Sequence, residues 1–375
     1  FRLAILETEL LGRDAAERRL TNMWPGDGTG IAAPNPALEE DVLTYRQILD
    51  AGPESVPAER IEAFKANHGY FARVALAYGK PEEAVERAAV LDGGGALLLV
   101  LMGACGGMVL LALAGLTCFV IALVRMASGQ VSWRFERPMT GGSVGLEMLA
   151  VFVTGFVLLK YVSAAVEAAV TPAGGAAPEW MTAAHLGMQW SLIVILLYPL
   201  LRGVSFERLS SVVGWTRGRG VLREIGAGLF GYLAELPLLF VAFVITVTIM
   251  FIIQAVRIRA GLPNEPVSNP ILDLVGSASP LAIILLVTLA TIWAPIVEET
   301  IMRGAFYRHL RGFMGVVLAG VISAIVFGVL HGYAFFLLMP VMTLGFVFAI
   351  IREWRGSLIA CVTAHAVHNG MVMFL

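Results

Sequence analysis

The sequence is poor in charge for its length. Only 14% of its 375 residues are Asp, Glu, Lys or Arg, whereas 58% are hydrophobic, and the mean hydropathy is +0.80. A soluble domain carries a much larger share of charged residues. A single soluble enzyme and a disordered chain are therefore excluded, and the composition predicts an integral membrane protein.

A basic stripe and a cysteine framework are also missing. The formal net charge is -2, and the basic residues are scattered between apolar runs, so nothing indicates nucleic acid as a partner. The three cysteines, Cys105, Cys118 and Cys361, each fall inside an apolar run and form no CxxC pair. We predict that they are small core residues and not disulfide or metal ligands.

The charge that is present gathers at the start of the chain, because 26 of the 54 charged residues lie in residues 1–92. Apolar residues at helical spacing predict soluble helices at about 3–20, 37–49, 58–78 and 81–91, with a Pro/Gly loop over 25–36. Residues 71–88 resemble one imperfect tetratricopeptide hairpin, but one unit is too few for an array. A small helical cap is therefore favoured over a peptide-binding repeat, and the segment is a candidate for binding a protein partner.

Beyond residue 92 the apolar segments are long enough to cross a bilayer, which requires roughly 20 residues. We expect about eight spans, at about 95–124, 144–166, 186–201, 225–254, 280–297, 313–330, 335–351 and 358–375. The predicted fold is an all-α polytopic transmembrane bundle with the lipid bilayer as its partner. Its predicted parts are a soluble segment at 1–92, accessory transmembrane helices at 93–279 and a core at 280–375.

The basic residues between the spans predict the orientation. Lys and Arg follow the odd-numbered spans and are absent after the second, so the odd-numbered loops are expected to be cytoplasmic. Arg257 and Arg259, after the fourth span, are the one poor fit. The N-terminal segment is then extracytoplasmic, which would need an upstream export signal, in agreement with a chain that begins at Phe1.

Few ionisable groups lie inside the predicted spans, where each costs roughly 2.5 to 3.5 kcal/mol and is a functional candidate. Glu147, Lys160 and His185 lie near span ends, where reaching the interface explains them. Glu235 precedes Pro237 within a span, and both pairing with a neighbouring helix and a functional role are open for it. The others are concentrated in the last 80 residues: Glu298, Glu299, Arg303, His331, His365 and His368.

Three groups of polar residues occur there on successive apolar segments. On a helix Glu299 and Arg303 share a face and can pair, while Glu298 points about 100° away and is left free. A free carboxylate facing a poorly solvated cavity is suited to take a proton from water. His331 ends the next segment, and in the last one His365 and Asn369 share a face, with His368 as a second choice.

These residues resemble the three motifs of the CAAX prenyl endopeptidase and bacteriocin-processing family of intramembrane proteases. The matching positions are Glu298-Glu299-xxx-Arg303, Phe327-xxx-His331 and His365-xxx-Asn369, and the resemblance covers about 280–375. It implies a hydrolase that cleaves a peptide bond of a membrane-associated peptide or protein, and a bacterial inner-membrane location is our preferred interpretation.

The resemblance also implies roles for the motif residues. Glu298 would activate water as the general base, with His331 helping to hold the water, and His365 with Asn369 would stabilise the oxyanion. Glu299, Arg303, Phe327 and His368 would support them.

Members of this family are described as metalloproteases, so Glu298, His331 and His365 are candidates to ligate one divalent metal such as zinc. The sequence has no HExxH, and a metal-held water and a glutamate-activated water both remain open. No organic cofactor is expected. A serine mechanism is disfavoured because no GxSxG is present, and an aspartyl mechanism because the spans contain no Asp.

A non-enzymatic reading competes with the protease. Intramembrane Glu, Arg and His also mark transporters, and a catalytically silent scaffold or immunity protein would retain polar residues for packing. No internal duplication of the kind found in many carriers is visible, which favours the enzyme.

The depth of His331 is a difficulty for the three-motif site. His331 lies about 20 residues beyond Arg311, near the far side of the membrane at 1.5 Å per residue. A site can assemble only if that helix begins late, at about residue 318, or if residues 332–338 fold back.

Overall fold

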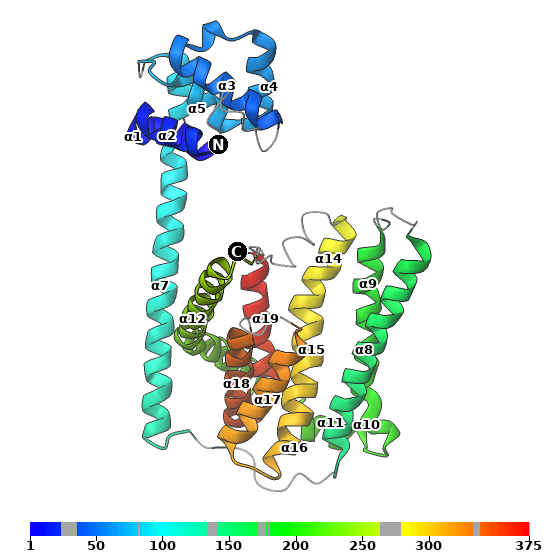
Figure 1. Ribbon diagram of the computed structural model, residues 1–375. Helices are drawn as coiled ribbons and strands as arrows, with labels where there is room; N and C mark the ends of the chain where they lie inside the picture. Colours follow the sequence, from blue (N-terminus) through cyan, green and yellow to red (C-terminus); the bar gives the residue numbers. More distant parts are fainter. Residues whose placement is uncertain are drawn as a thin grey trace. The chain divides into compact units, whose positions relative to one another are not determined.

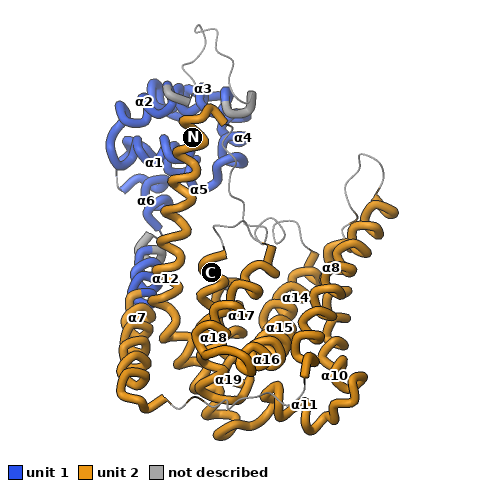
Figure 2. The backbone as a smooth tube through the Cα atoms, turned by 60° about the horizontal axis from the view of Figure 1, so that its bottom comes forward, with its two compact units in different colours: residues 1–108 blue, residues 109–375 orange. Residues whose placement is uncertain are grey.

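The computed structural model describes residues 1–23, 36–81, 83–92, 94–131, 133, 142–171, 178, 180–262, 279–332 and 338–374. These residues form helices and contain no strand, which confirms the all-α class. The chain divides into two compact units, Phe1–Met108 and Val109–Leu375 (Figure 2). The division falls inside the long helix α7 (Gly94–Ala127).

The first unit is built from short helices: α1 (Arg2–Leu11), α2 (Arg13–Met23), α3 (Pro36–Ala51), η1 (Pro53–Ser55), α4 (Ala58–His68), α5 (Tyr70–Ala77) and α6 (Val85–Leu91). The single helices predicted at 3–20 and 58–78 are wrong, because each is broken at a glycine. Gly12 has φ 88° and Gly69 has φ 53°, conformations that glycine adopts without a side-chain penalty. The loop predicted at 25–36 lies, except for Pro36, outside the described residues.

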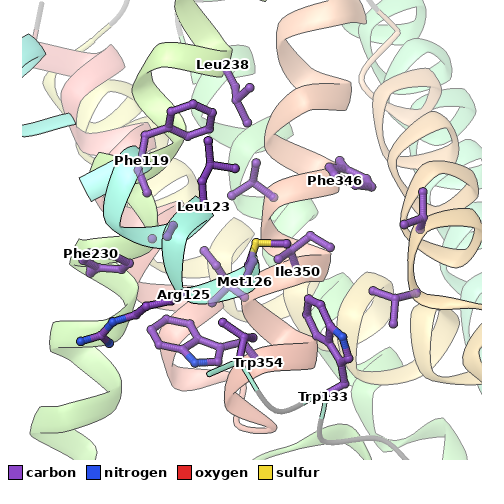
Figure 3. Close-up of a pocket in the computed structure, with 18 of the residues that line it drawn as sticks. Phe119, Leu123, Arg125, Met126, Trp133, Phe230, Leu238, Phe346, Ile350 and Trp354 are labelled. Atoms are coloured by element: carbon purple, nitrogen blue, oxygen red, sulfur yellow. The ribbon is translucent and has the colours of Figure 1, made fainter. Parts of the chain in front are cut away.

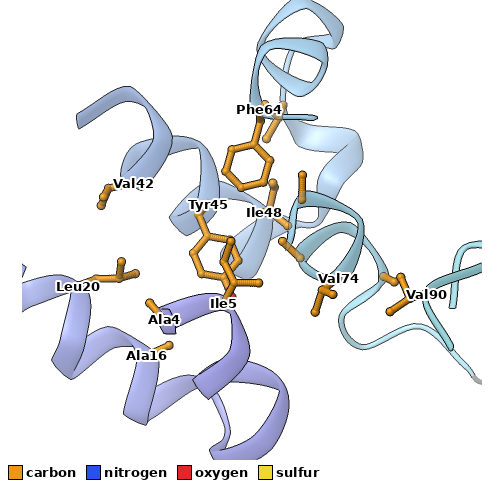
Figure 4. Close-up of a cluster of buried hydrophobic side chains, with 14 residues drawn as sticks. Ala4, Ile5, Ala16, Leu20, Val42, Tyr45, Ile48, Phe64, Val74 and Val90 are labelled. Atoms are coloured by element: carbon orange, nitrogen blue, oxygen red, sulfur yellow. The ribbon is translucent and has the colours of Figure 1, made fainter. Parts of the chain in front are cut away.

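A small apolar core holds this unit together (Figure 4). Tyr45 on α3 lies at its centre with no exposed surface, and its ring stacks on that of Phe64 at 6.4 Å between centroids. The Tyr45 hydroxyl donates to Oγ1 of Thr8 on α1 at 2.6 Å. The unit therefore has its own hydrophobic core, with one buried phenol hydrogen-bonded inside it.

The buried phenol predicts a loss of stability at alkaline pH. Burial raises the pKa of Tyr45 from 10 to about 12, so folding favours the protonated phenol. The stabilisation of this unit that results from the raised pKa is about 2–3 kcal/mol. It is complete below pH 10 and is lost as the pH rises towards 12. Unfolding of the first unit followed by limited proteolysis should show this loss, and Tyr45→Phe should remove the part that falls between pH 10 and 12. An unchanged alkaline profile in Tyr45→Phe would contradict the assignment.

The second unit is a bundle of apolar helices (Figure 1). After α7 come α8 (Val144–Val170), α9 (Trp180–Trp190), η2 (Ser191–Leu197), α10 (Tyr198–Leu201), α11 (Phe206–Val213) and α12 (Val221–Arg259). A continuous run follows: α14 (Pro280–Thr288), η3 (Leu289–Trp293), α15 (Ala294–Glu299), η4 (Thr300–Phe306) and α16 (Tyr307–Arg311). The last three helices are α17 (Val316–Leu330), α18 (Leu338–Arg355) and α19 (Ile359–Phe374).

Five stretches of the described chain are long and apolar enough to cross a membrane, which makes this an integral membrane protein. They are Leu98–Ala127, Val144–Val170, Trp180–Leu201, Val221–Arg259 and Pro280–Arg311. The remaining predicted spans correspond to α17, α18 and α19, which have 15, 18 and 16 residues. The number of about eight spans therefore stays a prediction.

Close helix packing brings α12 onto the last two helices. A Cβ atom at Gly228 would lie 2.5 Å from the carbonyl oxygen of Ala360 on α19, and one at Gly231 would lie 2.5 Å from Ile351 on α18. Only a residue without a side chain permits these approaches, a device common in membrane helix packing. The same face of α12 carries Glu235 one further turn along, which points this carboxyl into the bundle.

Buried ion pairs fix the end of α18. Arg311 on α16 pairs with Glu353 at 2.9 Å, and Arg355 pairs with Glu224 on α12 at 2.7 Å. Both carboxylates are fully buried, and each also accepts a further hydrogen bond, Glu353 from Tyr307 and Glu224 from the Arg219 amide. Paired and hydrogen-bonded in this way, the buried charges hold α18 in a defined position.

Candidate active site

The two adjacent glutamates lie on a helix with unusual hydrogen bonding. The segments before and after α15, Leu289–Trp293 and Thr300–Phe306, are π-helical. Such segments are rare and frequently occur at functional sites, because they change which residues share a face. Glu298 and Glu299 end the short α15 between them; α15 packs on α19, and the π-helical segment that follows contacts α17 and α18.

Glu299 and Arg303 form the pair that their spacing predicts. The Arg303 guanidinium donates to Oε1 of Glu299 at 3.0 Å, and neither side chain has any exposed surface. Arg303 also donates to the Gly345 carbonyl on α18 at 3.0 Å, and its guanidinium carbon lies 4.3 Å from the centroid of the Phe327 ring on α17. This one arginine therefore connects the glutamate helix with two neighbouring helices.

Glu299 has a second partner that the sequence did not reveal. Nδ1 of His365 on α19 lies 2.9 Å from Oε1 of Glu299, and His365 is 4% exposed. A carboxylate at Nδ1 fixes the orientation of the ring and leaves Nε2 directed away from the glutamate. Glu299 therefore orients His365 as well as neutralising Arg303.

Glu298 differs from its neighbour. It is half-buried, its Oε2 is fully buried, and neither carboxylate oxygen has a hydrogen-bond partner among the described residues. A carboxylate left without protein partners in an apolar surrounding needs a water or a ligand to satisfy it. Of the two glutamates, Glu298 is thus the one available to act on another molecule.

His331 reaches the same region because α17 is short. The chain turns between Arg311 and Val316, and the 15 residues of α17 extend only about 22 Å, so His331 at its end stays within the bundle. Its Nδ1 lies 2.8 Å from the Phe327 carbonyl oxygen and therefore donates to it. The helix begins at Val316, close to the start at about residue 318 that assembly of the site requires, and the depth of His331 in the membrane stays a prediction. The alternative is a fold-back over 332–338, of which residues 333–337 lie outside the described part of the chain.

Phe327 is the residue around which the three motifs meet. Its ring centroid lies 4.6 Å from that of His331 and 6.1 Å from that of His365. With Arg303 over its face, Phe327 touches a residue of each motif. Phe348 on α18 also borders the site, with its ring centroid 5.4 Å from that of His365, and no local pattern in the sequence predicts this contact.

The two remaining polar residues of α19 point in different directions. The Asn369 amide donates to the carbonyl of Ala290, in the first π-helical segment, at 2.8 Å, so one of its two N–H groups is already used. His368 lies against Tyr232 of α12, with 6.1 Å between ring centroids, and its Nδ1 is buried without a hydrogen bond among the described residues. His365 and Asn369 therefore face the glutamate helix, whereas His368 faces α12.

The described residues do not form a ready metal site. No three His, Cys, Asp or Glu side chains in the described ranges come together in a way that could hold a metal ion. Nδ1 of His365 and Nδ1 of His331 are both engaged by oxygen atoms of the protein, as the second ring nitrogen of a metal-ligating histidine usually is, so these contacts do not argue against ligation through Nε2. The divalent metal therefore stays a prediction.

Residues 280–371 match the family described as type II CAAX prenyl endopeptidase Rce1-like. This segment is similar to that family. The match confirms the resemblance drawn from the three motifs, all of which lie inside the matched segment. Neither a curated protein nor a solved structure matches the chain. Helix α12, with Glu235 and Tyr232, lies outside the matched segment yet packs against it.

Glu235 is the other carboxyl without a partner in this region. It has no exposed surface, and neither of its oxygens is hydrogen-bonded within the described residues. The charged groups that act on it electrostatically are Arg303 and Glu299. The sequence left open whether Glu235 pairs with a neighbouring helix, and no described side chain forms a hydrogen bond with it.

Replacing Glu235 by leucine is expected to stabilise the protein. A buried polar group without a partner costs about 1–3 kcal/mol, and Leu removes this cost at similar volume. The measurement is thermal unfolding in detergent. Glu224→Leu is the matched control, because Glu224 is equally buried on the same helix but pairs with Arg355, and its loss should destabilise. A lower unfolding temperature in Glu235→Leu would show that the carboxyl has a stabilising partner.

Proposed function

We propose that the protein is an intramembrane endopeptidase that hydrolyses a peptide bond of a membrane-associated peptide or protein. The observation that supports this most directly is the contrast between the two glutamates. Glu299 is held by Arg303 and His365, whereas Glu298, next to it, has no partner among the described residues. This is the arrangement expected of one positioning and one reacting carboxylate.

In the proposed reaction Glu298 takes a proton from a water molecule as its oxygen attacks the carbonyl carbon of the substrate. The negative charge moves to the carbonyl oxygen, where His365 and the remaining N–H of Asn369 stabilise it. Because Nδ1 of His365 donates to the Glu299 carboxylate, Nε2 can donate to the oxyanion only when both ring nitrogens carry a proton. Glu298 then passes its proton to the leaving amine as the carbon–nitrogen bond breaks.

His331 is assigned to hold the attacking water. Because Nδ1 donates to the Phe327 carbonyl, Nε2 of the neutral ring carries the lone pair and can accept a hydrogen bond from water. His331 and Glu298 would then orient the water between them. Phe327 and His368 are assigned supporting roles, Phe327 by separating the two imidazoles and His368 by packing against α12.

The test is cleavage of a quenched membrane-peptide library by the purified protein in detergent. Wild type should cut, and His331→Ala and His365→Ala should cut at least 10²-fold more slowly. Parallel reactions with a chelator test the metal, since a water activated by Glu298 alone predicts unchanged rates. Activity that survives in both histidine variants would reject the catalytic roles assigned to His331 and His365.

A further inference from the structure

An apolar groove lies within the second unit, between the last turns of α7 and helices α12, α17 and α18 (Figure 3). Its volume is about 720 Å³, within the range of small-molecule sites. Helix α7 approaches α12 closely at one point, where a Cβ atom at Gly115 would lie 3.0 Å from the Leu233 carbonyl oxygen. The groove is thus a space between these helices, and none of its lining residues belongs to the three motifs.

The lining is apolar except at one end. Figure 3 shows Phe119 and Leu238 at one end and Arg125, Trp133 and Trp354 at the other. Among the described residues that line the groove, only Arg125 is charged. An apolar channel whose one end carries an arginine and two tryptophans matches an amphiphile with a chain and a polar head, because Trp and Arg are typical of the membrane–water interface.

The charge balance at this end favours an anionic head group. Arg355 lies over the Trp354 ring, but its charge is neutralised by the buried Glu224. Arg125 is exposed and makes no ion pair with any residue that the structure describes. A neutral occupant would leave that charge unmatched, whereas a phosphate can form a bidentate charge-assisted pair with a guanidinium. The loops predict this end to be cytoplasmic, where anionic lipids attract basic residues.

We propose that this groove binds an anionic phospholipid, with an acyl chain between Phe119, Leu238 and Phe230 and its phosphate on Arg125. The site does not depend on the proposed hydrolysis, because none of its residues belongs to the three motifs. Helix α18 joins the two regions, since Phe346 and Ile350 line the groove while Gly345 and Phe348 border the catalytic residues. A lipid in the groove would therefore pack against α18, the helix whose Gly345 carbonyl accepts a hydrogen bond from Arg303.

The test is native mass spectrometry of the full chain released from nanodiscs that contain equal amounts of phosphatidylglycerol and phosphatidylcholine. Wild type should retain phosphatidylglycerol preferentially. Arg125→Gln should reduce this preference about tenfold, the effect of losing one charge-assisted interaction. Arg259→Gln is the matched control, because Arg259 is an exposed arginine at the end of α12 that does not line the groove, and it should behave as wild type.

A second variant tests the chain site. Ala122→Phe places a ring in the groove and should lower the retention of both lipids while the elution profile of the folded protein stays unchanged. Equal retention of the two lipids by wild type, or unchanged preference in Arg125→Gln, would overturn the proposal. A third outcome would also overturn it: an isoprenoid alcohol that displaces phosphatidylglycerol equally well from wild type and from Arg125→Gln. The groove would then bind a lipid-modified substrate.

Discussion

Glu298→Gln is expected to reduce peptide hydrolysis by about 10²- to 10⁴-fold, the usual contribution of a positioned general base. The amide keeps the size of the side chain and cannot accept the proton of water. Because no described residue bonds to the Glu298 carboxylate, the substitution removes no protein contact, and the unfolding temperature should stay within experimental error of wild type. Initial rates on a cleaved library peptide, with thermal unfolding in the same detergent, measure both quantities.

The pair of adjacent glutamates supplies a control for this result. Glu299→Gln should also lower the rate, but through the loss of the carboxylate that holds Arg303 and His365, and it should lower the unfolding temperature as well. A base and a positioning residue are therefore distinguished by stability and not by rate alone. A Glu298→Gln variant that cleaves the peptide at the wild-type rate would refute the assignment of Glu298 as the base.

Glu299→Leu is expected to destabilise the protein by about 3–5 kcal/mol, because it leaves the fully buried Arg303 without a counter-charge. Arg303 would retain only the Gly345 carbonyl and its aromatic neighbours Phe327 and Phe348. The expected readout is a large fall in the unfolding temperature. This loss of stability is larger than that expected from breaking an exposed ion pair, because exposed pairs contribute at most about 1 kcal/mol.

The double variant Glu299→Leu with Arg303→Met separates charge from packing. Apolar residues of similar volume in place of a buried ion pair often restore stability, so the double variant should unfold close to wild type. Its hydrolysis rate should remain low, because His365 no longer has its carboxylate partner. A double variant as unstable as Glu299→Leu would show that the pair matters through its packing geometry and not through its charge.

The sequence predicts those parts of this structure that depend on short-range spacing. Apolar periodicity and length identify a helical membrane protein, and i,i+4 spacing identifies the Glu299–Arg303 pair. The glycine breaks at Gly12 and Gly69 were missed because apolar residues continue at helical spacing on both sides of each.

Contacts between distant residues could not be predicted in the same way. The His365 contact joins residues 66 positions apart, and the Gly345 contact of Arg303 uses a backbone carbonyl, which has no sequence signature. The π-helical segments were likewise not predicted, since neither contains a proline or another residue that would set it apart from an α-helix.

The short α17 has a consequence for the surrounding lipid. If α17 is one of the predicted spans, its length of about 22 Å is less than the roughly 30 Å of the hydrocarbon layer, and the bilayer beside it faces a hydrophobic mismatch. Lipids adjust to such a mismatch by thinning locally, at a cost that rises with their chain length. A thinner layer brings the head groups and their water closer to His331. The supply of water for hydrolysis is then a property of the membrane as well as of the protein, and short-chain lipids would ease its entry.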